Sequence, residues 1–278
     1  IDYDARSNGL LATGQVRFAS DSTVQQVVLN QFRLGRTDVP GEWKRGPGGV
    51  EVALRGAALE LPRLRHALST RHELAAKDPG GAAAVSHAST KLNLQLQQVL
   101  TEIGTLGYAN GRAELSGETI VSADVTFGAG QGSTFRVTPG NPGRSVFLYV
   151  ANFGAMLRDA GWIDGLADGY LHIEGRYRDH SPAAALDGKL KMGPYRLQRV
   201  TPRGTIGTLN SAIEGLNRAG NGLQQFDGLE ANITKSGDRI QVRNGHTSGQ
   251  SIGLTTQGWV DLRTDTAQLS GIVVPAFA

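Results

Sequence analysis

The chain has 278 residues, enough for one large all-β domain or for two smaller domains, each with a buried core. The chain has 28 Lys and Arg residues and 25 Asp and Glu residues, which gives a net charge of +3. Basic and acidic residues are interspersed along the chain, and no run of basic residues marks a nucleic-acid surface. The absence of cysteine excludes disulfide frameworks, thiolate zinc sites and a cysteine nucleophile.

The 38 glycines follow no collagen-like period, and in a chain with few helical stretches they indicate many tight turns. The chain begins with Ile1 and shows no signal-peptide pattern. Its most apolar run, residues 146–157, is shorter than the roughly 20 residues of a membrane-spanning helix. We therefore expect the chain to be an excerpt of a longer protein whose anchor lies outside it.

The first predicted region, residues 1–69, is a β-meander with a short terminal helix. Residues 9–59 alternate between apolar and polar side chains, which is the period of β-strands. The sequence Gly-Pro-Gly-Gly at residues 46–49 predicts a hairpin turn, because glycine adopts the positive φ angles that such turns require. Residues 61–68 have helical spacing, and residues 70–89, which have neither period, predict a flexible linker.

The remaining region, residues 90–278, is predicted to be mostly β. Its first strand changes phase at Gln97 and Gln98, as at a β-bulge. Helices are expected near residues 151–162 and 204–219. The region closes with strands at residues 226–234, 238–244, 252–262 and 266–274, joined by Gly, Asp, Asn and Ser. The whole chain is therefore predicted to be an antiparallel β-sheet with a few short helices.

Two glycine-rich motifs suggest enzymatic sites and fail on their context. The G-x-S-x-G pattern around Ser251 requires a helix after the serine, whereas the following residues have the pattern of a strand. Residues 128–132 are also followed by a strand, although a dinucleotide loop needs a helix N-terminus. An esterase that uses Ser251 with His246 and Asp261 remains the enzymatic alternative.

The histidines and carboxylates form no recognisable catalytic or metal-binding pattern. None of the six histidines has metal-ligand spacing, and no pair of acidic residues has the arrangement of an acid/base couple. We therefore expect no catalytic residue, no metal, no cofactor and no enzymatic activity.

Several short motifs resemble the AsmA-like C-terminal region of Gram-negative envelope proteins, and in particular the YhdP-type branch related to TamB. The resemblance covers most of residues 92–278 and is looser over residues 9–68. The motifs are Leu-His-Ile-Glu-Gly-Arg at 171–176, Leu-Asp-Gly-Lys-Leu at 186–190, the helical residues 209–216, Gly-Gln-Ser-Ile-Gly-Leu-Thr-Thr-Gln-Gly at 249–258, Val-Asp-Leu at 260–262, and Leu-Ser-Gly-Ile-Val-Val-Pro-Ala at 269–276.

The resemblance implies a parent protein in the periplasm that is anchored in the inner membrane by an N-terminal helix outside this chain. It implies a long, curved sheet that forms a U-shaped apolar groove, and a role in phospholipid transport to the outer membrane. The expected partner is therefore phospholipid or a similar lipid. We expect no binding of nucleic acid, and the sequence does not identify a protein partner.

A lipid groove needs a continuous apolar surface, because each exposed CH₂ group costs about 0.8 kcal/mol in water. Alternation along a strand sends every second side chain to one face. The residues predicted to line the groove are Val16, Phe18, Val28, Phe32, Leu92, Leu94, Leu96, Val125, Phe127, Phe135, Val137, Leu171, Ile173, Leu186, Leu190, Ile240, Val242 and Leu254. Phe153, Met156 and Trp162 are the candidates for the groove end.

Two non-enzymatic alternatives remain open. The apolar faces of the strands pack against another sheet or against the helices in most all-β proteins. The chain is also consistent with a structural or scaffolding module of the envelope, whose sheet edges bind protein partners.

Overall fold

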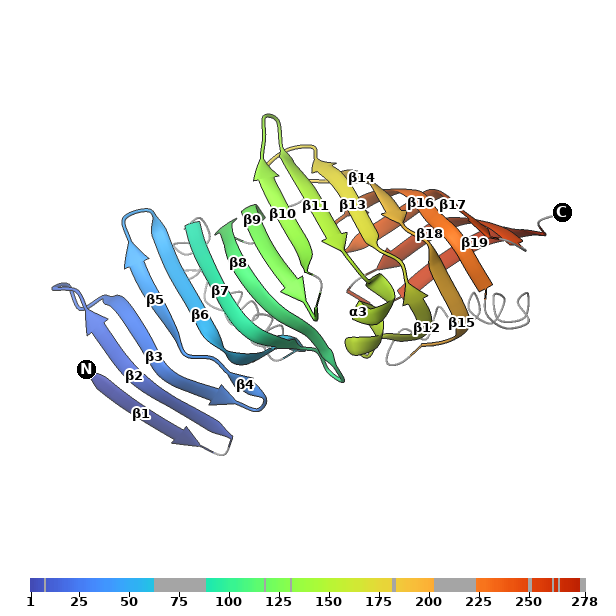
Figure 1. Cartoon of the computed structure of the whole chain (residues 1–278). Coiled ribbons are helices and arrows are strands. Elements are labelled where there is room, and N and C mark those ends of the chain that lie inside the picture. Colours follow the sequence, from blue (N-terminus) through green and yellow to red (C-terminus); the bar gives the residue numbers. More distant parts are fainter. Residues whose placement is uncertain are drawn as a thin grey trace. The chain divides into compact units, whose positions relative to one another are not determined.

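The computed structural model describes residues 1–7, 9–62, 89–117, 119–130, 132–181, 184–202, 224–249, 252–261, 263–264 and 266–275. Over these residues the fold is mostly β, as predicted: 19 strands pair in a mixed, mostly antiparallel arrangement (Figure 1). The chain divides into two compact units, Ile1–Ala129 and Gly130–Ala278, and each unit is described by itself.

The strands of the first unit pair largely in chain order, from β1 to β9. The short β4 pairs with β3 and β6, and β3 also pairs with β5. The bounds are β1 (Asp2–Ser7), β2 (Leu10–Phe18), β3 (Val24–Leu34), β4 (Thr37–Asp38), β5 (Gly41–Gly46), β6 (Gly49–Glu60), β7 (Ser89–Leu100), β8 (Thr105–Ser116) and β9 (Thr119–Gly128).

One pair of neighbours, β6 and β7, is parallel, which departs from the predicted antiparallel sheet. Parallel neighbours require a crossover connection of about a dozen residues or more. Residues 61–88, which join these strands, are long enough for it. Leu61 and Pro62 are helical, as predicted, whereas the rest of that helix and residues 70–88 of the predicted linker lie outside the described residues.

Two local predictions in the first unit are confirmed. The turn at residues 46–49 joins β5 to β6, and Gly46 and Gly49 pair across it. The register of β7 and β8 shifts between Leu96 and Val99, so that Gln97 and Gln98 form the predicted bulge.

The second unit is an antiparallel sheet in which β10, β11, β13, β14, β16, β17, β18 and β19 are successive neighbours. A side arm of β12 and β15 joins it through the beginning of β16. The bounds are β10 (Ser133–Pro139), β11 (Arg144–Val150), β12 (Ile163–Asp168), β13 (Leu171–Tyr177), β14 (Leu186–Met192), β15 (Tyr195–Pro202), β16 (Gln224–Ser236), β17 (Arg239–Gly249), β18 (Ile252–Asp261) and β19 (Thr266–Pro275).

The helix α3 (Phe153–Asp159) confirms the helix predicted near residues 151–162. It begins where the Asn152 side chain accepts a hydrogen bond from the Ala155 amide at 2.9 Å, and Gly161 follows its end with a φ of +74°. Gly154 allows α3 to pack closely on β12, because an added Cβ would lie 2.6 Å from the Leu166 carbonyl oxygen. The helix predicted at residues 204–219 lies outside the described residues.

The bulge at Gln97 and Gln98 depends on a glycine in the facing strand. Gly107 has a φ of +82°, and an added Cβ would lie 2.2 Å from the carbonyl carbon of Gly128. We predict that Gly107→Ala lowers the free energy of unfolding by about 2 kcal/mol or more, measured by urea titration.

The control is Gly48→Ala in the β5–β6 turn, where an added Cβ meets no atom within 4 Å. This variant should stay within about 0.5 kcal/mol of the parent protein. Equal stability of the two variants would show that the conformation of Gly107 imposes no constraint.

Candidate functional site

One face of the first unit is apolar across neighbouring strands. Residues paired across neighbouring strands lie on the same face, so the register links them into rows that cross the sheet. Three rows define the first apolar face: Gly14, Leu29, Gly41, Leu54, Leu94, Gly111 and Val125; Val16, Val27, Trp43, Val52, Leu92, Ala113 and Ala123; and Leu96, Ala109 and Phe127.

The opposite face of the same strands is mostly polar. Every row here consists of the residues that alternate with those of the first apolar face. Three rows define the first polar face: Gln15, Val28, Glu42, Ala53, Asn93, Arg112 and Asp124; Arg55, Gln95, Asn110 and Thr126; and Arg17, Gln26, Lys44, Glu51, Lys91 and Glu114.

The structure places Val28 on the first polar face, away from the other predicted lining residues of this unit. Thr13 pairs with Gln31 and Gly14 with Leu29, so Asn30 is an extra residue that shifts the phase of β3. Val28 consequently faces Gln15, whereas the remaining predicted lining residues of this unit share the first apolar face: Val16, Phe18, Phe32, Leu92, Leu94, Leu96, Val125 and Phe127.

Sequence reasoning also missed members of this face. Trp43, Val52 and Leu54 lie in its rows, next to predicted lining residues. The signal was available for Val52 and Leu54, because they alternate with Glu51 and Ala53 in the same way as the predicted residues alternate with their neighbours.

The second unit also has an apolar face, and all of its predicted lining residues lie on it. Four rows define this second apolar face: Val137, Val146, Gly175, Gly188, Ile233, Val242, Gly258 and Leu269; Phe135, Leu148, Ile173, Leu190 and Ala231; Val150, Leu171, Met192, Leu229, Thr247 and Leu254; and Leu186, Lys235, Ile240, Val260 and Ala267. Bulges in β16 and β17 keep these rows in phase.

Both apolar faces lack a second layer over most of their rows, within the part of the chain that the structure describes. Among the described elements, the extensive contacts are those between strands that are neighbours in the sheet and those between α3 and β12. None of them places a second sheet on either apolar face. Leu92, Leu94, Val125 and Ile173 are half-buried, although such side chains are fully buried in an ordinary two-layer domain. Other members of the rows are buried, among them the predicted lining residues Leu96, Val137, Leu171 and Leu186. In other proteins, large exposed apolar surfaces are found at protein, membrane or ligand interaction sites.

The second apolar face ends in a packed cluster at the side arm. The rings of Tyr195 and Phe226 stack with centroids 4.9 Å apart, and Phe226 is fully buried. The Tyr195 hydroxyl donates to Thr247 Oγ1 at 3.1 Å, and burial raises the pKa of Tyr195 above its ordinary value. Leu229 and the predicted lining residue Leu254 pack against this cluster, which therefore closes this end of the face.

The three groove-end candidates lie beside the same cluster. Phe153 and Met156 belong to α3 and are half-buried, and Trp162, just after the helix, is 38% exposed. The helix packs on β12, whose Leu166 contacts the Tyr195 cluster.

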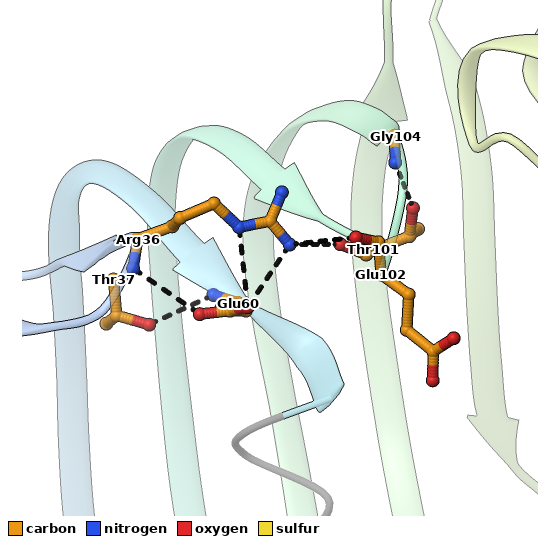
Figure 2. A network of polar contacts seen from close by, with 6 residues as sticks. All are labelled: Arg36, Thr37, Glu60, Thr101, Glu102 and Gly104. Carbon is orange, nitrogen blue, oxygen red and sulfur yellow. Dashed lines mark hydrogen bonds and ion pairs between the residues drawn. The ribbon is translucent and has the colours of Figure 1, made fainter.

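In the first unit, a polar network is centred on Arg36 (Figure 2). The Arg36 guanidinium forms an ion pair with Glu60 at 3.1 Å and donates hydrogen bonds to the carbonyl oxygens of Thr101 and Glu102. The Glu60 amide donates to Thr37 Oγ1, and the Gly104 amide donates to Thr101 Oγ1. One guanidinium thus joins the β3–β4 turn, the end of β6 and the β7–β8 turn.

The described residues bear on a metal site and on the G-x-S-x-G motif. They contain no group of three or more His, Asp or Glu that is placed to hold a metal ion. Ser251 lies outside the described residues, and Ile252 begins β18, so the segment after the serine is a strand rather than the helix of a nucleophile elbow. No described helix has the length and apolarity that crossing a bilayer requires.

Comparison with protein-family models, curated proteins and solved structures finds no match to this chain. The arrangement itself defines a β-sheet protein with one apolar and one polar face in its first unit, and a second apolar face in its second unit.

The Arg36 network generates a stability prediction. Arg36→Ala removes the ion pair with Glu60, whose side chain is only 13% exposed, and it removes the donor to two carbonyl groups. We expect the free energy of unfolding to fall by about 1–2 kcal/mol in urea titration.

The matched control is Arg6→Ala, which removes an ion pair with Asp4 in which both side chains are more than half exposed. The urea concentration at the midpoint of unfolding should not change in this variant, because exposed ion pairs contribute little to the free energy of unfolding. If Arg36→Ala were as stable as Arg6→Ala, the network would not hold the three segments together.

Proposed function

We propose that the chain binds lipid acyl chains on its apolar faces and conducts phospholipid between the inner and outer membranes without catalysing a reaction. The observation that carries the proposal is the continuity of the apolar rows across the strands, with no second layer over most of them in the described part of the chain. The U-shaped groove expected from the sequence belongs to this proposal.

The chemistry of the rows suits acyl chains. Neighbouring strands are about 4.8 Å apart, so a row of Leu, Val and Phe side chains offers apolar contact at every step across the sheet. Covering this surface with acyl chains removes apolar area from water, at roughly 25 cal/mol per Å². Such contacts have no fixed direction, and a lipid therefore moves from one row to the next without breaking specific bonds.

The motifs that resemble the AsmA-like region support the choice of lipid and of compartment. On this proposal the parent protein is anchored in the inner membrane and this chain lies in the periplasm. A scaffold that binds protein partners is the competing function, and the following experiment separates the two.

We expect a photoactivatable amino acid at Leu94 or at Phe127 to crosslink phospholipid when the full chain is incubated with phospholipid vesicles. Both residues lie on the first apolar face. The matched controls are Gln95 and Thr126, the next or preceding residues in the same strands, which lie on the first polar face. Mass spectrometry of the crosslinked products gives the measurement.

Crosslinks to lipid from all four positions, or from none, would contradict the proposal. Crosslinks to a protein from Leu94 and Phe127 in cell envelopes, without lipid, would support the scaffold instead.

Trp162 tests the end of the second apolar face. Trp162 is 38% exposed, so most of its surface is buried and Trp162→Ala should also lower the melting temperature. Lipid is therefore counted at a temperature at which circular dichroism shows the variant to be folded. We expect the lipid that co-purifies with the chain, counted by native mass spectrometry, to decrease in this variant. Ile103→Ala, at an exposed apolar residue in the β7–β8 turn, is the control and should retain its lipid.

A further inference from the structure

The first polar face carries a cavity that the lipid proposal does not use. It has a volume of about 810 Å³ and lies over β6, β7 and β8. This size falls within the range of about 300–1,000 Å³ that is typical of sites for small ligands. Its polar lining comes from Arg55, Asn93, Gln95, Asn110 and Arg112, with Gln97 and Tyr108 beside them.

The register explains why these side chains meet. Asn93 pairs with Arg112, and Gln95 pairs with both Arg55 and Asn110, so the lining consists of two adjacent rows of the first polar face. Leu94, which lies between Asn93 and Gln95, points to the opposite face. Leu94 and Leu96 also border the cavity, although alternation directs their side chains to the first apolar face.

The lining is cationic. It contains the guanidinium groups of Arg55 and Arg112 and no carboxylate. Neither guanidinium has a hydrogen bond or an ion pair with any residue that the structure describes, in contrast to Arg33 and Arg178, which pair with Asp38 and Asp187. Two such guanidinium groups in one cavity offer charge and hydrogen-bond donors to an anion, and Asp124, which faces Arg112 from β9, lies outside the lining.

The other polar groups define the ligand further. The amides of Asn93, Gln95 and Asn110 each donate and accept hydrogen bonds, and none of them forms a side-chain hydrogen bond with the described residues. Groups that both donate and accept are complementary to hydroxyl groups, which do the same. The half-buried ring of Tyr108 adds an apolar surface against which a sugar ring can lie.

We propose that this cavity binds an acidic saccharide, with the carboxylate or phosphate groups on Arg55 and Arg112 and the hydroxyl groups on the amides. Arg55 and Arg112 are two strands apart and one row apart, which places their Cα atoms roughly 12 Å from each other. A ligand that reaches both therefore has the length of a disaccharide or more.

The same observations argue against other ligands. An acyl chain has no partner for four amides and two cations. Single-stranded nucleic acid is held by several stacking aromatic side chains along a cationic groove, and this lining contains one aromatic residue.

The test is isothermal titration calorimetry of the full chain with oligogalacturonate at low ionic strength, and with a neutral malto-oligosaccharide of equal length. We expect oligogalacturonate to bind and the neutral saccharide to bind at least about tenfold more weakly. Arg55→Gln and Arg112→Gln should each weaken binding about tenfold, and Asn110→Ala several-fold.

The matched control is Arg17→Gln. Arg17 is another exposed arginine of the first polar face without a partner among the described residues, and it lies outside the cavity. The affinity of the Arg17→Gln variant for oligogalacturonate should stay within about twofold of that of the parent chain. Because lipid crosslinking from Leu94 reads out the opposite face, either proposal can fail while the other stands.

Three outcomes would overturn this assignment. These are the absence of binding to oligogalacturonate, an equal loss of affinity in Arg17→Gln and Arg55→Gln, and tighter binding of an oligothymidylate that the Arg55 and Arg112 variants abolish. Circular dichroism of each variant establishes that the substitutions, all at exposed side chains, leave the fold intact.

Discussion

The period-2 alternation of the strands, held in register from one strand to the next, is the constraint on which the rest of this structure depends. A slip of one residue moves every side chain of a strand to the opposite face. The bulges at Gln97 and Gln98 in β7, and between Val242 and Gly245 in β17, show how the chain restores the phase where alternation would otherwise fail. Because the register is kept, the apolar rows and the cationic cavity coexist on opposite faces of the first unit.

A sheet without a second layer obtains its stability from few places. In the described residues these are the cluster around Leu96 and Val99, the Arg36 network, and the stacked Tyr195 and Phe226 at the side arm. Both clusters lie at the margins of the apolar rows, where side chains from turns and from the side arm reach over the face. Elsewhere on the two faces burial varies: Leu92, Leu94 and Ile173 are half-buried, whereas Val137, Leu171 and Ile233 are buried.

Sequence reasoning predicted what local chemistry determines, namely the turn at residues 46–49, the bulge in β7, the four closing strands and the helix α3, although β17 extends to Gly249 rather than to residue 244. It failed in β3, where three consecutive apolar residues, Val27 to Leu29, fit either face of the sheet. The phase shift at Asn30 could not be recognised from this pattern, and Val28 was therefore assigned to the wrong face. The parallel β6–β7 pair and the cavity both depend on which strands become neighbours, and alternation within a single strand carries no information about that.

The parallel β6–β7 pair also has a consequence for how the first unit folds. Strands β1 to β6 and strands β7 to β9 are each joined by short turns, so each group forms from contacts that are local in the sequence. Joining the two groups requires residues 61–88 to close a loop, and the entropy of that closure must be overcome before β6 and β7 gain any contact. We therefore expect the rows of the first apolar face to become continuous only after this loop has closed. Until then β6 and β7 each have an unpaired edge to which another chain can add a strand.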